Sequence, residues 1–125
     1  MSNTALVLID MQNDFLHPEG AYARAGINCE AISALPAVLA PVCDAIRRSG
    51  DWVLSTHFTL VPGWDAEPFI SEHLRELRPF LAKGDFAPGS FGQALIRELS
   101  PADLSIEKVA YSAFYMSRLE WVLHQ

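Results

Sequence analysis

Residues 5–15 read ALVLIDMQNDF, so five apolar residues are followed directly by an acid, Asp10. A continuous apolar run of this length is typical of a strand whose two faces are both covered by helices. Open α/β sheets bind their ligands beyond the carboxyl ends of such strands. The stretch therefore predicts an α/β fold and makes Asp10 a candidate functional residue, while Gln12 and Asn13 are expected to hold the loop that follows.

Three later segments have helical character. Apolar residues recur at steps of three and four over 29–49, which predicts an amphipathic helix with Gly50 as its C-terminal cap. A short helix is expected at 93–99. Another is expected at 117–125, where Ser117 is a suitable N-cap residue.

Two more short segments, WVLST at 52–56 and LSIE at 104–107, predict a second and a third strand. Strands that alternate with helices form a parallel sheet with right-handed crossovers, here about half of a doubly wound unit. In the common strand order 3-2-1-4-5-6 the first strand is central, whereas three strands alone leave it at an exposed edge. We therefore expect residues 1–125 to form a single domain that is incomplete at its C-terminus, or one that a partner completes.

The composition argues against two classes of partner. Half of the 125 residues are apolar and 19% are charged, which is typical of a folded chain. The net charge of −6 and the scattered basic residues argue against nucleic-acid binding, which needs clustered Lys and Arg. No apolar run approaches the roughly 20 residues that a membrane-spanning helix requires. We expect neither nucleic acid nor a membrane as a partner.

The remaining bulk features concern compartment and assembly. The first residues lack the basic segment of a secretory signal, and Cys29 and Cys43 are too few for a disulfide framework. Two reduced thiols are usual in the cytoplasm, which is the expected location. The apolar fraction is high for so small a domain, so we expect a homo-oligomer.

Three longer phrases occur in a fixed order along the chain. They are LVLIDMQNDF at 6–15, GSFGQALIREL at 89–99 and IEKVAYSAFYMSRLEWVL at 106–123. In order and spacing they resemble the isochorismatase-like family of cysteine hydrolases, and the resemblance runs from about Thr4 to Gln125. It implies a Rossmann-like α/β/α domain, here its N-terminal part, that hydrolyses a small-molecule amide or related C–N bond, or in some members a vinyl ether.

The resemblance also implies roles for two residues. Amidase members of the family use an Asp–Lys–Cys triad, and by motif Asp10 matches the aspartate and Lys108 the lysine. A carboxylate beside an ammonium can act as a general base toward a thiol or water, and the ammonium can stabilise developing negative charge. The expected roles are therefore general base for Asp10 and electrostatic partner for Lys108.

The cysteine of that triad has no match among these residues. In the family it lies at the start of a helix after the fourth strand, and neither Cys29 nor Cys43 has that position. Cys43 falls within the apolar periodicity of 29–49 and has the pattern of a core residue. A second hypothesis therefore stays open, namely a non-catalytic binding or assembly subunit derived from this family.

Further site residues are implied beside the pair. Nicotinamidase members carry an Asp and His metal cluster after the second strand, but here His57 has neither a carboxylate nor a second histidine nearby. We therefore expect no metal and no other cofactor, and His57 is either a wall of the substrate pocket or a satisfied histidine. The candidate contacts to a small-molecule substrate are Phe15, His57, Phe91, Tyr111 and Phe114.

Overall fold

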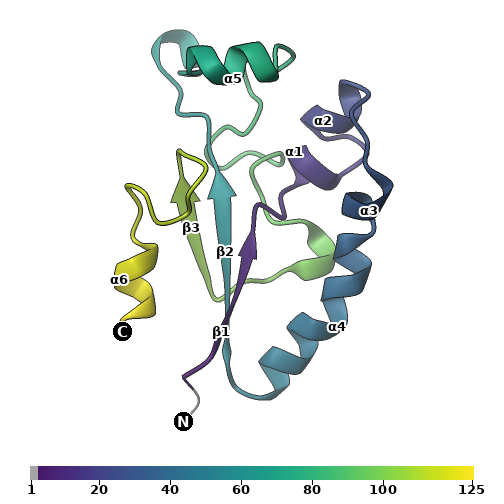
Figure 1. The fold of residues 1–125 in the computed structure, drawn as a ribbon, viewed down its shortest axis with the longest axis vertical. Coiled ribbons are helices and arrows are strands. Elements are labelled where there is room, and N and C mark those ends of the chain that lie inside the picture. Colours follow the sequence, from purple (N-terminus) through teal and green to yellow (C-terminus); the bar gives the residue numbers. More distant parts are fainter. Residues whose placement is uncertain (1–2) are drawn as a thin grey trace.

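The computed structural model describes residues 3–125 and contains a three-stranded, fully parallel sheet (Figure 1). The strands are β1 (Ala5–Ile9), β2 (Trp52–Phe58) and β3 (Leu104–Lys108). Their spatial order is β1-β2-β3, so β2 is central. Ile9 lies beside Thr56, and Phe58 lies beside Lys108, which brings the carboxyl ends of all three strands to one edge of the sheet.

Helices and turns connect the strands. The long helix is α4 (Leu35–Arg48). The shorter ones are α1 (Asn13–Leu16), α2 (Ala21–Arg24), α3 (Glu30–Ser33), α5 (Glu72–Leu77) and α6 (Leu119–Leu123), with 3₁₀ turns η1 (Trp64–Ala66) and η2 (Arg97–Leu99). In Figure 1, α1, α2 and α5 lie beyond the arrowheads of the strands. Across residues 3–125, every helix is too short or too polar to cross a bilayer.

Alternation along the strands divides the core between the two faces of the sheet. On one face, Leu8 of β1 and Val53 of β2 are buried against Cys43 of α4, together with Leu99 of η2. This is the apolar stripe of the amphipathic helix that the sequence predicts. The 29–49 periodicity therefore positions α4 over β1 and β2.

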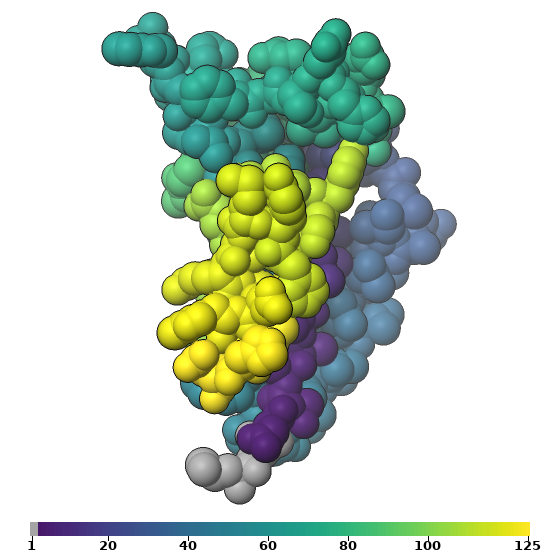
Figure 2. Space-filling view, turned by 60° about the vertical axis from the view of Figure 1, so that its left-hand side comes forward, coloured from purple at the N-terminus to yellow at the C-terminus, as the bar shows by residue number. Residues whose placement is uncertain are grey.

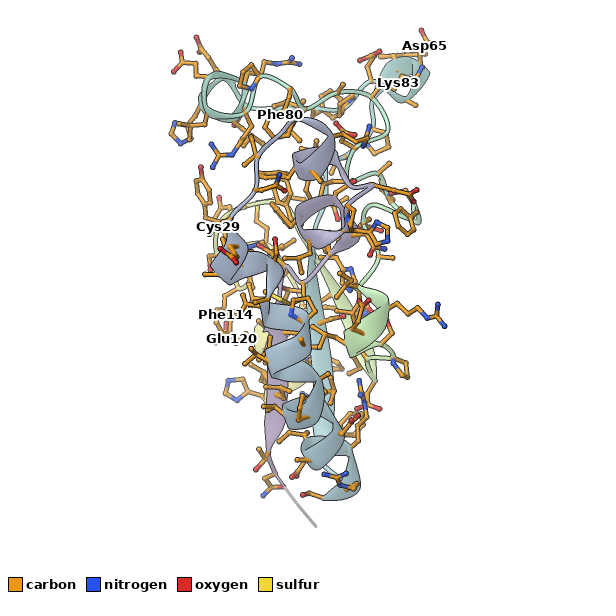
Figure 3. All side chains as sticks on the ribbon, turned by 90° about the vertical axis from the view of Figure 1, so that its right-hand side faces the viewer. Cys29, Asp65, Phe80, Lys83, Phe114 and Glu120 are labelled. Carbon is orange, nitrogen blue, oxygen red and sulfur yellow. The ribbon has the colours of Figure 1, made fainter. Side chains whose placement is uncertain are left out.

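The C-terminal segment covers the opposite face. Leu54 of β2 and Ile106 of β3 are buried with Ala113 and with Leu119 of α6. Figure 2 shows this segment, in yellow, beside the purple N-terminal strand, and in Figure 3 α4 lies in front of the sheet with α6 behind it. The three layers confirm the expected α/β/α fold class.

The helix expected over 29–49 is divided in two. α3 and α4 are separated at Ala34, and Pro36 lies in the first turn of α4, where a missing N–H is tolerated. The expected C-terminal cap is confirmed, because Gly50 has a positive φ of 77° and its N–H donates to the Arg47 carbonyl at 3.0 Å.

The prediction of a helix at 93–99 is wrong over most of that range. The Asn13 N–H donates to the Ala94 carbonyl, and the Ile96 N–H donates to the Met11 carbonyl. Residues 92–96 therefore lie antiparallel to the segment that follows β1, and only the three residues of η2 are helical. Long-range backbone pairing overrides the local periodicity here.

The helix expected at 117–125 begins later than predicted. Arg118 is the N-cap of α6, which starts at Leu119. The Ser117 hydroxyl donates to the Ala113 carbonyl and accepts the Leu119 N–H at 3.2 Å. Ser117 thus closes the turn that precedes the helix instead of capping the helix itself.

Truncation of Ile106 tests the core beneath α6. Ile106→Ala is expected to lower the free energy of unfolding by about 2–5 kcal/mol, because it removes fully buried methyl and methylene groups and leaves a cavity. The control Val38→Ala truncates a side chain on α4 that is 62% exposed, and a change of about 0.5 kcal/mol or less is expected. Urea unfolding measures both, and equal losses would contradict this placement of the core.

Candidate active site

Asp10 and Lys108 meet at the carboxyl ends of β1 and β3. Lys108 Nζ lies 3.0 Å from Asp10 Oδ2 and donates a second hydrogen bond, of 2.7 Å, to the Tyr111 carbonyl. The Lys108 side chain is 4% exposed, whereas the Asp10 side chain is 27% exposed. The fold thus brings the two predicted catalytic residues together, with a buried ammonium and a carboxylate that keeps one side open.

The backbone at Asp10 adopts a conformation that few residues other than glycine adopt. Its φ is 58°, in the left-handed region. The Asp10 N–H lies 3.2 Å from the Thr56 carbonyl and 3.3 Å from the Thr56 hydroxyl, and that hydroxyl donates to Asp10 Oδ1 at 3.5 Å. Strain of this kind is concentrated at functional sites and persists only where neighbours hold it. Thr56, which the sequence did not single out, orients the carboxylate.

Gln12 fixes the chain just beyond the end of β1. Its fully buried amide accepts the Phe58 N–H at 2.7 Å and donates to the Phe58 carbonyl at 2.8 Å. The same amide nitrogen donates to the Gln93 carbonyl at 3.0 Å. Asn13 donates to the Phe91 carbonyl at 2.8 Å. The expectation that Gln12 and Asn13 hold this loop is confirmed, and we call the Gln12–Phe58 hydrogen bonds the Gln12 clamp.

A second buried acid, Asp14, ties α2 to two loops. Its carboxylate accepts the Ala21 N–H at 2.9 Å and the Phe86 N–H at 2.7 Å, and the Arg24 guanidinium lies 3.8 Å away. Gly92 lies so close that a Cβ would overlap this carboxylate. Asp14 could not be identified from the sequence, because an acid within a polar stretch carries no sign of its burial.

His57 lies on the face of the sheet opposite to Lys108. Alternation along β2 directs Thr56 toward α6, and directs Ser55 and His57 toward the α4 side. His57 Nε2 lies 2.6 Å from Ser55 Oγ, and Nδ1 lies 2.8 Å from the Gln93 carbonyl. The structure therefore does not bring this ring to the Asp10–Lys108 pair. Contact of His57 with a substrate stays a prediction.

Of the aromatic candidates, Phe15 lies in α1 and Phe91 lies in a loop that contacts α1. Phe15 packs against Phe86 and Tyr22, with ring centroids 4.6 and 4.9 Å apart. Phe91 is exposed and makes an edge-to-face contact with the His17 ring, with the two ring centroids 5.0 Å apart. Phe15 therefore contributes to a third apolar cluster, and the substrate contacts expected of both residues stay predictions.

Tyr111 and Phe114 lie on the segment that follows Lys108. Their side chains are 76% and 55% exposed, and the Tyr111 carbonyl is one of the two partners of the Lys108 ammonium. Their position next to the pair is compatible with contact to a small molecule. That role also stays a prediction.

The match to a known family covers nearly all of the chain. Residues 4–125 match the model of the isochorismatase domain. The chain belongs to the isochorismatase family. Ureidoacrylate amidohydrolase RutB of Stutzerimonas stutzeri is 31% identical over 137 residues, which cover 98% of this chain and 54% of that protein. The chain thus spans about half the length of the curated relatives it matches.

Solved structures agree with this family membership. A cysteine hydrolase from Pseudomonas syringae pv. phaseolicola superposes with a TM-score of 0.74 at 20% identity, covering 99% of this chain and 55% of that one. N-carbamoylsarcosine amidase from Thermoplasma acidophilum has a TM-score of 0.68 at 25% identity, covering 96% of this chain and 60% of that one. The first shows a shared fold, and the second adds recognisable sequence similarity.

Neither thiol of this isochorismatase-family chain is placed to serve Asp10. Cys43 is buried on α4, on the face of the sheet opposite to Lys108, and burial raises the pKa of its thiol. Cys29 is exposed at the N-cap of α3 (Figure 3). Residues 3–125 also contain no group of three or more His, Cys, Asp or Glu side chains suited to a metal ion.

Thiol labelling at neutral pH tests this placement of the cysteines. Cys29 is expected to react with iodoacetamide rapidly, and Cys43 slowly in the folded protein, because its thiol is buried and its raised pKa leaves less thiolate. Raising the pH toward 9 should increase labelling at Cys43, and unfolding in urea should bring the two rates together. Peptide mass spectrometry measures both sites, and equal rates in the folded protein would contradict the assignment.

Proposed function

We propose that this chain carries the base and the cation of an amide hydrolase of the isochorismatase family. The observation that supports this proposal is the 3.0 Å pair between Asp10 and Lys108 at the carboxyl edge of a parallel sheet. The buried ammonium lies against one oxygen of the Asp10 carboxylate, and the open side of that carboxylate leaves room for a proton donor. A carboxylate held in this way is suited to general-base catalysis.

In the proposed reaction Asp10 removes a proton from the attacking group. Oδ2 is bound to Lys108, so Oδ1, which Thr56 orients, is the oxygen that accepts this proton. The attacking atom bonds to the amide carbon, and negative charge develops on the carbonyl oxygen. Within residues 3–125 the Lys108 ammonium uses two of its three hydrogens, on Asp10 and Tyr111, and the third can stabilise that charge. The proton then passes from Asp10 to the leaving nitrogen as the C–N bond breaks.

We assign the attacking group to water or to a thiol from outside residues 3–125. The buried Cys43 lies across the sheet from Lys108, and Cys29 lies beside α3. A thiol at the N-terminus of a longer helix would be activated by the helix dipole and by a neighbouring base. A water molecule would rely on Asp10 alone.

The names of two relatives suggest the substrate class. One is named for ureidoacrylate and the other for N-carbamoylsarcosine. Both molecules carry a carbamoyl group on nitrogen, so the bond to be hydrolysed joins a carbonyl carbon to nitrogen. We propose a small ureido or carbamoyl amide as the substrate of this protein, with a vinyl ether as the second choice.

A second function, a non-catalytic binding or assembly subunit, is favoured by the surface that follows Lys108. The side chains of Tyr111, Phe114, Tyr115 and Met116 are all more than half exposed. Clustered apolar side chains of this kind are typical of protein interfaces. The same surface fits a homo-oligomer, in which case the cluster would be covered by a second copy.

Replacement of Asp10 tests the proposed activity. Asp10→Asn is expected to lower kcat on ureidoacrylate or N-carbamoylsarcosine by about 10²–10⁴-fold, because the general base is lost. The control Asp44→Asn neutralises an exposed carboxylate on α4, and kcat should be unchanged. Ammonia release from the purified protein measures both variants, and an Asp10→Asn protein with the full kcat would contradict the proposal.

The second function predicts different results for the same purified protein in activity and light-scattering measurements. A protein that hydrolyses neither amide, and that light scattering shows to be a stable oligomer, would support the binding or assembly subunit. Substitution of Phe114 and Met116 by Ser should then reduce the oligomer to a smaller species. An active enzyme whose assembly is unchanged by these substitutions would exclude it.

A further inference from the structure

One carbonyl oxygen links His57 to the segment that follows β1. The Gln93 carbonyl accepts from Gln12 Nε2 at 3.0 Å and lies 2.8 Å from His57 Nδ1. A carbonyl oxygen has two lone pairs, so these two partners saturate it. The Gln12 clamp holds the segment that follows Asp10, whereas His57 lies on the α4 side of β2. The two residues are thereby coupled through a single atom.

The partners of His57 fix its tautomer. The Gln93 carbonyl can only accept, so Nδ1 of a neutral His57 carries the hydrogen and donates it. Nε2 must then accept, and Ser55 Oγ at 2.6 Å is its donor. Ser55 in turn lies 3.4 Å from the Ser105 hydroxyl on β3. The ring is therefore held in one orientation with a defined donor aimed at Gln93.

Gln93 is held at its side chain as well as at its carbonyl. Its Nε2 donates to the Thr59 hydroxyl at 2.7 Å, and its Oε1 accepts the Gly89 N–H at 2.8 Å. Thr59 follows directly after β2, and its own N–H donates to the Lys108 carbonyl at 2.9 Å. Gln93 therefore contacts the segments that follow β1 and β2, and Thr59 links it to the backbone of Lys108.

We propose that His57 is a positioning residue for Asp10, acting from the opposite face of the sheet through the Gln93 carbonyl and the Gln12 clamp. The His57 hydrogen bond directs one lone pair of that carbonyl, which leaves the other aligned with Gln12 Nε2. Gln12 in turn holds the chain two residues after Asp10 in register with Phe58. The effect of His57 on catalysis rests on the proposed amide hydrolysis, whereas the structural coupling of His57 to the Gln12 clamp does not.

Two isosteric variants separate the hydrogen bond from the presence of the ring. An Asn amide nitrogen can occupy the position of Nδ1, so His57→Asn keeps a donor to Gln93. A Gln amide reaches the position of Nε2, so His57→Gln keeps the Ser55 contact and loses that donor. Backbone amide exchange at Phe58, whose N–H donates to Gln12, reports the clamp directly. Exchange at Ile46 in α4 serves as the internal reference.

His57→Gln is expected to speed exchange at Phe58 by about threefold to tenfold, the effect of one lost hydrogen bond, with Ile46 unchanged. His57→Asn should restore the rate to within about twofold of wild type. In an active preparation His57→Gln should lower kcat with little change in KM, and His57→Asn should recover it. Because exchange requires no substrate, the coupling can be judged even if the protein hydrolyses no amide.

Equal exchange rates at Phe58 in the two variants would overturn the proposal, since a purely space-filling ring would be missed equally in both. If His57→Gln fails to fold, nitrogen NMR of the wild-type imidazole decides instead. A hydrogen on Nδ1 with an unprotonated, hydrogen-bonded Nε2 supports the proposal. A hydrogen on Nε2 of the neutral ring overturns it, because Nδ1 would then have nothing to donate to Gln93.

Discussion

The ion pair between Asp10 and Lys108 joins two strands that do not pair with each other, and the candidate site depends on it. β1 and β3 lie on either side of β2, which separates their axes by about 10 Å at the usual strand spacing. Only a long side chain can cross that distance, and Lys108 reaches Asp10 Oδ2 at 3.0 Å. A buried ammonium without this carboxylate would be costly, so strand order, register and the pair are interdependent.

The polar residues after β1 hold the carboxylate half of that pair. Asp10 turns into the left-handed region, and residues 11–14 then run antiparallel to 92–96. Gln12 bonds both backbone groups of Phe58, and the Asp14 carboxylate fits against Gly92. The phrases MQNDF and GSFGQAL are therefore two sides of one structural unit, which gives a physical reason for their occurring together.

Features with local causes could be predicted from the sequence, and those with long-range causes could not. Short segments rich in apolar residues located all three strands, an acid at a strand end identified Asp10, and the family resemblance identified Lys108. The periodicity of 93–99 suggested a helix because pairing with 11–14 leaves no local trace. β2 extends to Phe58, two residues beyond the predicted strand, so His57 lies within it and its face follows from alternation. A strand buried on both faces gives no pattern that reveals this.

The most direct test of the account is a double-mutant cycle on the pair, read as the free energy of unfolding in urea. Asp10→Asn leaves a buried ammonium without its charge partner, and Lys108→Met leaves a carboxylate without its cation. The combined loss of the two single variants should therefore exceed that of the double variant by about 1 kcal/mol or more. Additivity within about 0.5 kcal/mol would show that the two side chains act independently and would contradict the central role given to the pair.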